Sequence, residues 1–224
     1  MCGRFTLASP AEVVAKDFAL DDVPELAPRY NIAPTEPVAA IRVCSARRVF
    51  EHRRWGLVPA WARDAGGPPL FNARAETLAR KPAFRDAFRL RRCLVPADGF
   101  YEWRAVSGRR QPFHLRRADG APFAMAGLYE RWRPAGGEAL ESCTVITTAA
   151  NALLAPLHDR MPVVLPAEAW EAWLDPTGRD VEALSPWLRP APEAGWLAYP
   201  VDPRVNQARH DEPGNVEPLF DGAP

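Results

Sequence analysis

Apolar and polar residues alternate in short runs along most of this chain, and proline interrupts many of them. Residues 38–43 and 47–55 have the composition of strands, and the dipeptide Ser45-Ala46 between them predicts a tight turn. Asp119-Gly120 is typical of a β-hairpin turn. The pattern predicts a chain built mainly from short strands, with further strands expected within residues 93–103, 112–132, 141–150 and 196–201.

A helical spacing of apolar residues appears only in short stretches. Pro82 at a first turn and the pair Phe84 and Phe88 predict one such helix. No segment has the pattern of a βαβ nucleotide-binding unit or a glycine-rich phosphate loop. We therefore expect an α+β fold, a single compact domain with a mainly antiparallel, β-barrel-like core. Its short helices are expected at residues 11–20, 82–90, 149–156, 166–174 and 180–188.

Composition excludes several protein classes. Of the 224 residues, 47% are hydrophobic and 25% are charged, which excludes a disordered or collagen-like chain. No apolar run approaches the ~18 residues of a membrane span. The first ten residues lack the apolar region of a secretory signal, so a cytoplasmic protein is expected.

Charge is unevenly distributed although the net charge is zero. Residues 1–112 carry 19 basic and 12 acidic side chains, whereas residues 113–224 carry 9 and 16. Nearly all the basic residues are arginine, which binds phosphate with two donors. This bias is consistent with an anionic partner of the N-terminal half, or with GC-rich codon usage and solvated faces. Charge alone does not separate the two.

The four cysteines form no CxxC pair, so neither a structural zinc site nor another metal or cofactor is expected. Cys44, Cys93 and Cys143 lie in apolar, strand-like runs and are interpreted as core residues. Cys2 is different because it follows the initiator methionine, which is generally removed before a small residue. Removal would leave an amine with a pKa of about 7.7–8.0 beside a thiol of about 8.5.

A 1,2-aminothiol of this kind has distinctive chemistry. Its amine can form a Schiff base with an aldehyde, and the thiol can then close on the imine to give a thiazolidine ring. The alternative is that Cys2 is a chance residue at a frayed terminus.

Two further clusters could carry chemistry. On an extended segment Asn72, Arg74 and Glu76 share one face. The amide could orient a sugar oxygen or an amine and the guanidinium could bind a phosphate, or the three could form a plain polar edge. Glu102 lies between two aromatic residues, where desolvation would raise its pKa toward values useful for acid–base catalysis. It could equally be a strand residue that faces solvent.

His158 follows the predicted helix 149–156, and the helix dipole would favour its cationic form, or it could simply cap the helix. Trp55 and Trp61 alternate with arginines, as in surfaces where bases stack on indoles beside bound phosphates. The alternative is a core tryptophan surrounded by surface arginines, which applies better to Trp55.

Taken together, these segments resemble a known family, the SOS response associated peptidase (SRAP) family. The resemblance rests on MCGRF, YNIAPT, RWGLVPAW, FNARAET, RRCLVPADGFYEW, MAGLYERW, LHDRMPVVL and VNQARHDEP. It covers nearly the whole chain and implies a domain at residues 2–219, followed by a tail at 220–224. The family fold is a compact α/β domain with a barrel-like core, in agreement with the strand pattern.

The resemblance implies a protein that binds abasic sites in single-stranded DNA. It would trap the opened sugar on its N-terminal cysteine as a covalent thiazolidine crosslink in the DNA damage (SOS) response. The implied catalytic residues are Cys2, Asn72, Glu102 and His158. The implied DNA-contacting residues are Arg4, Pro34, Trp55, Trp61, Arg74 and Thr147. We expect a monomer that acts at damaged DNA in the nucleoid, without membrane association.

In this interpretation Glu102 is the acid that opens the sugar ring, and Asn72 holds the Cys2 amine and a substrate oxygen in register. His158 would bind the opened sugar hydroxyl or set the charge of Glu102. Lyase activity and self-removal of Met1 are further activities that the resemblance allows. Two other functions stay open: a peptidase with Cys2 as nucleophile and His158 as its partner, and a non-catalytic module that binds single-stranded DNA.

Overall fold

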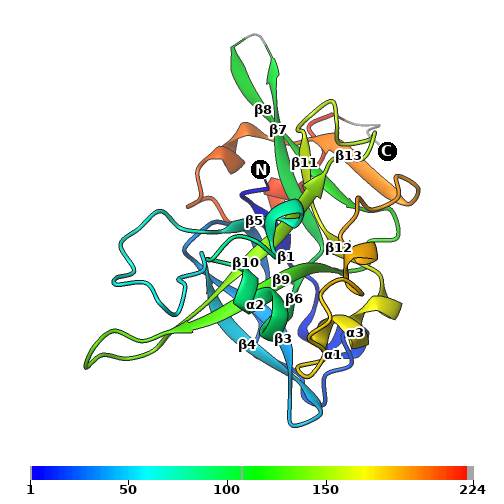
Figure 1. The fold of residues 1–224 in the computed structure, drawn as a ribbon. Coiled ribbons are helices and arrows are strands. Elements are labelled where there is room, and N and C mark those ends of the chain that lie inside the picture. The colour runs from blue at the N-terminus through cyan, green and yellow to red at the C-terminus, as the bar shows by residue number, and fades with distance from the viewer. Residues whose placement is uncertain (1, 107, 221–224) are drawn as a thin grey trace.

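Strands are the main regular structure of the chain, of which the computed structural model describes residues 2–106 and 108–220 (Figure 1). One sheet has five strands, each antiparallel to its neighbours. In spatial order they are β13 (Trp196–Pro200), β8 (Arg109–Arg117), β7 (Gly99–Val106), β1 (Phe5–Leu7) and β2 (Arg29–Ile32).

The second sheet closes on itself. Strand β10 pairs with β9 on one side and with β4 on the other, so β10, β4, β3, β6 and β9 form a ring. The pairings of β10 with β4 and with β5 are parallel, and the others are antiparallel. This ring confirms the α+β fold with a barrel-like core. Its strands and their neighbours are β3 (Pro37–Cys44), β4 (Arg47–Trp55), β5 (Asn72–Arg74), β6 (Arg92–Ala97), β9 (Phe123–Trp132), β10 (Leu140–Ala149), β11 (Arg160–Pro162) and β12 (Val164–Leu165).

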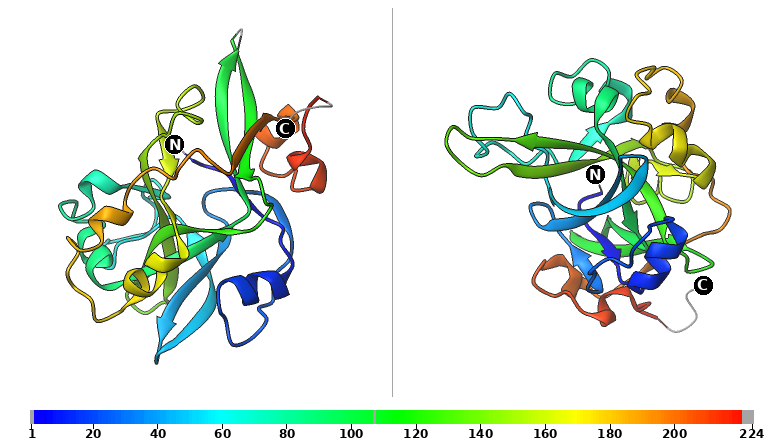
Figure 2. Two further views of the ribbon diagram at one scale, coloured as in Figure 1. Left: turned by 90° about the vertical axis from the view of Figure 1, so that its right-hand side faces the viewer. Right: turned by 90° about the horizontal axis from the view of Figure 1, so that it is seen from below.

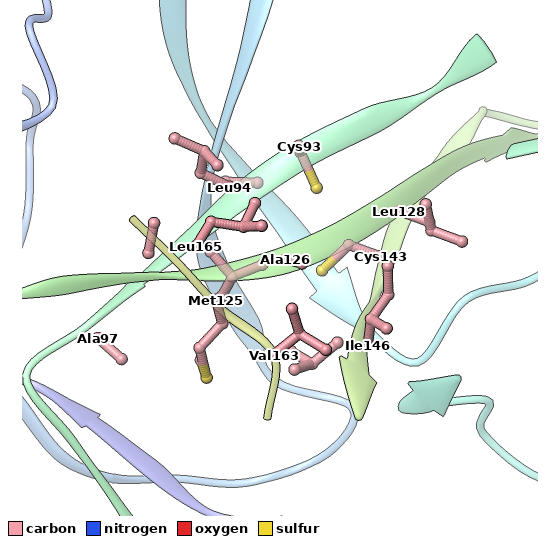
Figure 3. Packing of buried hydrophobic residues seen from close by; sticks show 14 of the residues in the cluster. Cys93, Leu94, Ala97, Met125, Ala126, Leu128, Cys143, Ile146, Val163 and Leu165 are labelled. Carbon is pink, nitrogen blue, oxygen red and sulfur yellow. The ribbon is translucent and has the colours of Figure 1, made fainter. Parts of the chain in front are cut away.

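Apolar side chains of β6, β9 and β10 fill the ring (Figure 3). Leu94, Met125 and Ile146 have no exposed surface. At Gly127 a Cβ atom would lie 2.8 Å from the Cys93 sulfur, so glycine is what allows β9 to approach β6 this closely. The barrel is therefore a packed core without a channel along these strands.

The helices are short and lie outside the ring (Figure 1). Phe18 stacks on Trp170 with 4.9 Å between the ring centroids, which joins the end of α1 to α3. Buried Arg92 donates to the carbonyls of Phe88 and Trp173, and so caps both α2 and α3. The helices are α1 (Ala11–Asp17), α2 (Arg85–Leu90) and α3 (Trp170–Leu174), with 3-10 turns at η1 (Ala75–Thr77), η2 (Ala167–Ala169), η3 (Ser185–Trp187), η4 (Pro203–Asn206) and η5 (Pro213–Val216).

The predicted hairpin at Asp119-Gly120 is wrong, although a turn does form there. Asp119 accepts hydrogen bonds from Arg117 and from the amide of Ala121, and Gly120 has a φ of 71°. The strands on either side belong to different sheets, because β8 pairs with β7 and β13 while β9 pairs with β6. The turn therefore carries the chain from one sheet to the other.

Two helix predictions and one core assignment also need correction. Ala149 ends β10 and residues 152–157 form only hydrogen-bonded turns, while residues 180–188 form only a turn and η3. Pro156 and Pro186 have no N–H to extend the pattern. Cys44 is exposed because it ends β3 at the Ser45-Ala46 turn, whereas Cys93 and Cys143 are buried as expected.

Among the described residues, no helix is long and apolar enough to cross a membrane. Of the predicted tail, Phe220 is described and residues 221–224 lie outside the described residues.

Candidate active site

Strand β1 holds Cys2 against β7. Phe5 pairs with Phe100, and the Tyr101 amide donates to the carbonyl of Arg4 at 3.0 Å. Cys2 is completely buried, not frayed. Its burial raises the pKa of the thiol, the charge of Glu102 raises it further, and the positive N-terminus partly opposes both. The thiol is therefore protonated at neutral pH.

Asn72 connects Cys2 to the second sheet. It begins β5, which runs parallel to β10 and sets Asn72 opposite Val145. The Asn72 Nδ2 donates to the carbonyl oxygen of Cys2 at 2.7 Å. Its Oδ1 is buried and has no hydrogen-bond partner among the described residues. The amide thus fixes the Cys2 backbone and keeps an acceptor beside it.

Glu102 lies in β7 and is only 2% exposed. Burial raises its pKa to about 7, although the positive N-terminus and the charge of Arg110 act in the opposite direction. The sequence expectation of a desolvated carboxyl is met. A carboxyl with this pKa exchanges its proton readily at neutral pH.

His158 approaches the same site from the segment between β10 and β11. Its Nδ1 accepts from the amide of Arg160 at 2.9 Å and lies 3.0 Å from the carboxylate of Asp159. In the tautomer in which Nδ1 accepts from this amide, the neutral ring carries its proton on Nε2, whereas a proton on Nδ1 would be donated to Asp159. Burial lowers the pKa of His158, and the positive N-terminus lowers it further. The negative charge of Asp159 acts on both Glu102 and His158, which places the two side chains in one electrostatic environment.

The four predicted catalytic residues therefore come together from four segments: the N-terminus, β5, β7 and the β10–β11 connection. Figure 1 shows β5, β11 and the base of β7 around the chain's N-terminus. The expected extended face of Asn72, Arg74 and Glu76 holds only in part. The chain turns into η1 after Arg74, so Glu76 leaves the strand.

Three of the predicted DNA-contacting residues lie where a ligand could reach them. Arg74 is exposed, Pro34 is partly exposed, and Trp61 is 65% exposed. The Trp61 segment is held on both sides, since the Ala60 amide donates to Glu130 and the Trp132 indole donates to the carbonyl of Ala62. Their contact with DNA stays a prediction.

Of the other three, Trp55 and Thr147 are enclosed by protein and Arg4 is partly exposed. Trp55 has no exposed surface: it packs against Phe5 and donates to the carbonyl of Phe71 at 2.8 Å. A base cannot stack on it, which corrects that expectation. Thr147 is also fully buried.

Arg4 is committed to internal partners. It donates to Asn31 Oδ1 and to the carbonyl of Val205, both at 2.8 Å. These bonds tie the segment that carries Cys2 to the C-terminal region.

Sequence reasoning missed Arg160. Its guanidinium forms a two-pronged ion pair with Glu76, at 2.6 and 3.0 Å, and also donates to the carbonyl of Thr147 at 2.6 Å. The only sequence signal was its position two residues after His158. The pairing with Glu76 depends on the turn at η1, which the residue pattern did not indicate.

A family model described as SOS response associated peptidase (SRAP) matches residues 1–208. This chain belongs to the SRAP family. Among its relatives, abasic site processing protein YoqW of Bacillus subtilis is 39% identical over 97% of this chain and 99% of its own length. Abasic site processing protein YedK of Escherichia coli is 33% identical over 98% and 100%. Abasic site processing protein HMCES of Gallus gallus is 31% identical over 88% and 68%.

Solved structures support the same assignment for the SRAP fold. A crystal structure of a protein from Bacteroides thetaiotaomicron has a TM-score of 0.87 and 26% identity, covering 98% of this chain and 100% of that one. A protein from Bordetella bronchiseptica has a TM-score of 0.79 and 31% identity, covering 90% and 100%. The fold of this SRAP chain is thus shared along almost its entire length.

Proposed function

We propose that this SRAP protein binds abasic sites in single-stranded DNA and links the opened sugar covalently to Cys2 as a thiazolidine. Its relatives are named abasic site processing proteins. The observation that carries the proposal is the environment of Cys2. The residue is buried, its carbonyl is held by Asn72, and it lies in the field of a carboxyl whose pKa is about 7.

The reaction begins once Met1 is removed and the amine of Cys2 is free. An abasic sugar is mostly a closed hemiacetal, and Glu102 donates the proton that lets the ring oxygen leave C1′. The amine then adds to the C1′ aldehyde to give a carbinolamine. Loss of water from this intermediate gives an imine, and the thiol sulfur adds to the imine carbon while the nitrogen takes up a proton. One water is released overall.

The order of nucleophiles follows from the pKa directions. The buried thiol keeps its proton at neutral pH, so the amine attacks first. After Glu102 has given up its proton it is a carboxylate, and it can accept the thiol proton during ring closure. A pKa of about 7 suits a group that must both donate and accept.

Asn72 and His158 position the reactants in this scheme. The Asn72 Oδ1 is suited to accept an N–H of the Cys2 amine and aim its lone pair at C1′. His158 presents Nε2–H, which can donate to the hydroxyl released when the sugar opens. Outside this cluster, Arg74 and Trp61 would hold the strand by phosphate contact and base stacking.

The imine intermediate also bears on a possible lyase activity. An imine at C1′ is also the intermediate from which an abasic-site lyase cleaves the strand, so thiol closure competes with cleavage. We include self-removal of Met1, monomeric action and a location at damaged DNA in the cytoplasm in the same proposal.

Intact mass measurement tests the crosslink directly. The purified protein should lack Met1, and incubation with an abasic oligonucleotide should add the oligonucleotide mass minus one water. An oligonucleotide whose abasic sugar has been reduced to the alcohol is the matched control, since it has no aldehyde and should give no adduct. A protein with an uncleaved N-terminal tag should also give none. Equal crosslinking by the tagged protein would contradict the mechanism, and digestion of casein would favour a peptidase.

A further inference from the structure

The β7–β8 hairpin projects from the body of the molecule beside the active site (Figures 1 and 2). Strand β7 carries Glu102 near its base and continues outward to Val106. Between Trp103 and Pro112 the sequence contains three arginines and no acidic residue. We call Arg104, Arg109 and Arg110 the hairpin arginines.

The hairpin is anchored at its base by contacts with the C-terminal region. The Trp103 indole donates to Asn206 Oδ1 at 2.6 Å, and strand β8 packs against η4. Figure 2 shows the C-terminal turns beside this base. The anchor keeps the outward direction of the hairpin fixed relative to Glu102.

The charges of the hairpin arginines are left available. Among the described residues, no carboxylate forms an ion pair with any of the three. Arg110 instead lies over the ring of Trp103 at 5.6 Å, and Arg104 lies over Phe113 at 4.9 Å. A cation–π contact positions a guanidinium without neutralising it. At the other end of β8, in contrast, Arg117 is paired with Asp119.

The field of the hairpin reaches the reacting groups. Burial is the main influence on the pKa of both Glu102 and His158, and the positive charge of Arg110 lowers both values. Arg110 is therefore close enough to the site to act on a ligand bound there. The register of β7 and β8 places Arg104 and Arg109 on the same face of the hairpin as Glu102, whereas Arg110 lies on the face of Trp103 and reaches the site through its charge. An anion extending outward from the site along the hairpin would therefore pass Arg104 and Arg109 within the field of Arg110.

We propose that the hairpin arginines bind backbone phosphates of the DNA strand on one side of the abasic nucleotide. This inference rests on the proposed function. Strands rise ~3.3 Å per residue, so Val106 is ~13 Å beyond Glu102. A strand stacked as in a duplex advances ~3.4 Å per nucleotide. The hairpin thus spans roughly four nucleotides beside the lesion.

The salt dependence of affinity tests the contact. Binding is measured with Cys2→Ala protein, which cannot close the thiazolidine, on a 20-nucleotide single strand with a central abasic site. Each phosphate contact contributes ~0.7 to the slope of log affinity against log salt. Arg104→Ala/Arg109→Ala/Arg110→Ala should lower the slope by about 2, and replacement of all three by lysine should largely preserve it. Arg47→Ala is the matched single-charge control, at the exposed turn of β3–β4, and should leave the slope unchanged.

Truncated oligonucleotides locate the contact. One oligonucleotide keeps a single nucleotide on one side of the lesion and the full flank on the other. On the side that the hairpin contacts, this truncation should abolish the difference in salt slope between the hairpin variant and its Cys2→Ala parent. The same truncation on the other side should preserve that difference. Thermal unfolding checks that the triple variant is folded. If it is not, the single substitution Arg109→Glu replaces it in the same measurements.

The possible failures are distinguishable. If otherwise wild-type protein gives no adduct with any abasic strand, the proposed function is wrong. If it crosslinks but the folded hairpin variants keep the full salt slope, the hairpin inference is wrong. A slope difference that survives truncation on both sides would also overturn it.

Discussion

The buried polar groups on the two faces of β7 differ in their hydrogen bonding. One face carries Glu102 toward Cys2 and Asn72. The other carries Tyr101, whose ring lies 5.0 Å from that of His114. Behind it Asp98, Thr6, His114 and Tyr199 form a continuous set of polar contacts, which we call the Asp98 network.

Each polar side chain of the Asp98 network has a hydrogen-bond partner. Asp98 accepts from the Thr6 hydroxyl at 2.5 Å and from the amides of residues 8 and 9. His114 lies 3.4 Å from the Thr6 hydroxyl and 3.0 Å from the hydroxyl of Tyr199, which in turn donates to the carbonyl of Val216. Such a network joins the N-terminal, central and C-terminal segments.

The site face is organised differently. The Asn72 Oδ1 is buried without a hydrogen-bond partner among the described residues, and Glu102 has a pKa of about 7. Buried polar groups normally find partners, and exceptions call for a reason. The comparison teaches that the hydrogen bonds of the Asp98 network hold segments together, whereas the site face offers a substrate the unused acceptor of Asn72 and a carboxyl that titrates near neutral pH.

Replacing Cys2 should have the largest effect of all. Cys2→Ala keeps the terminal amine but has no sulfur to close the ring. We expect no denaturation-resistant adduct with abasic DNA, while cyanoborohydride should still trap the imine as an amine-linked adduct. Cys44→Ser is the matched control because Cys44 is an exposed cysteine at the end of β3. Wild-type adduct yield from Cys2→Ala without reductant would refute the role of the sulfur.

Glu102→Gln should slow single-turnover crosslinking by ~10²–10⁴-fold, because the amide keeps the shape but delivers no proton of useful acidity. Affinity for the abasic strand should stay nearly unchanged. The test is the single-turnover crosslinking rate at pH 6–8, with affinity measured in parallel. If Glu102→Gln crosslinks at the wild-type rate, Glu102 is not the acid and His158 becomes the candidate.

The same substitution should change how stability depends on pH. The folded-state pKa of Glu102, about 7, is above the usual ~4.3 of an unfolded chain. Its favourable contribution is complete below pH ~4.3 and is lost as pH rises through 7. Glu102→Gln should therefore gain stability relative to wild type between these values, measured by urea unfolding.

His114 should affect the stability of the protein in acid but not the rate of crosslinking. Burial lowers its pKa to about 3, against ~6.5 when unfolded. Its contribution is complete above pH ~6.5 and falls by up to ~1.4 kcal/mol per pH unit down to 3. His114→Gln should flatten this dependence, as unfolding measurements from pH 7 to 4 would show. Its crosslinking rate at pH 7.5 should match wild type, and a large rate defect in the folded variant would erase the distinction between the two faces.

Substitutions at two asparagines should have the smallest effects, and they test the difference between the structural contacts and the site. Asn31 donates to the carbonyls of Val205, Gln207 and His210 and accepts from Arg4, so Asn31→Ala should cost about 1–3 kcal/mol of stability. Asn72→Ala loses one bond to Cys2 and should be less destabilised, yet crosslink more slowly at every pH. Lower pH should not rescue it, since its defect is one of positioning. Equal stability losses in the two variants would contradict the distinction.

Local patterns predicted the elements whose signals are local. The alternation in residues 38–43 and 47–55 and the turn at Ser45-Ala46 correspond to β3 and β4, and both turn residues have positive φ. The same reasoning failed at Asp119-Gly120, because a turn residue specifies a change of direction and not the partner of the next strand. It failed at 149–156 because helical spacing of apolar residues does not offset the loss of donors at proline.

For the site, the amino-acid sequence by itself determined which side chains were available: an aminothiol precursor at Cys2, an amide at Asn72, a carboxyl at Glu102 and an imidazole at His158. Only the tertiary structure decided what each could do. Burial gave Glu102 a pKa of about 7 and enclosed Trp55, and a long-range ion pair joined Arg160 to Glu76. The physical reason is that desolvation and pairing depend on groups that are distant in the sequence. The partners of the Asn72–Cys2 bond, for example, are 70 residues apart, and no local pattern records that bond.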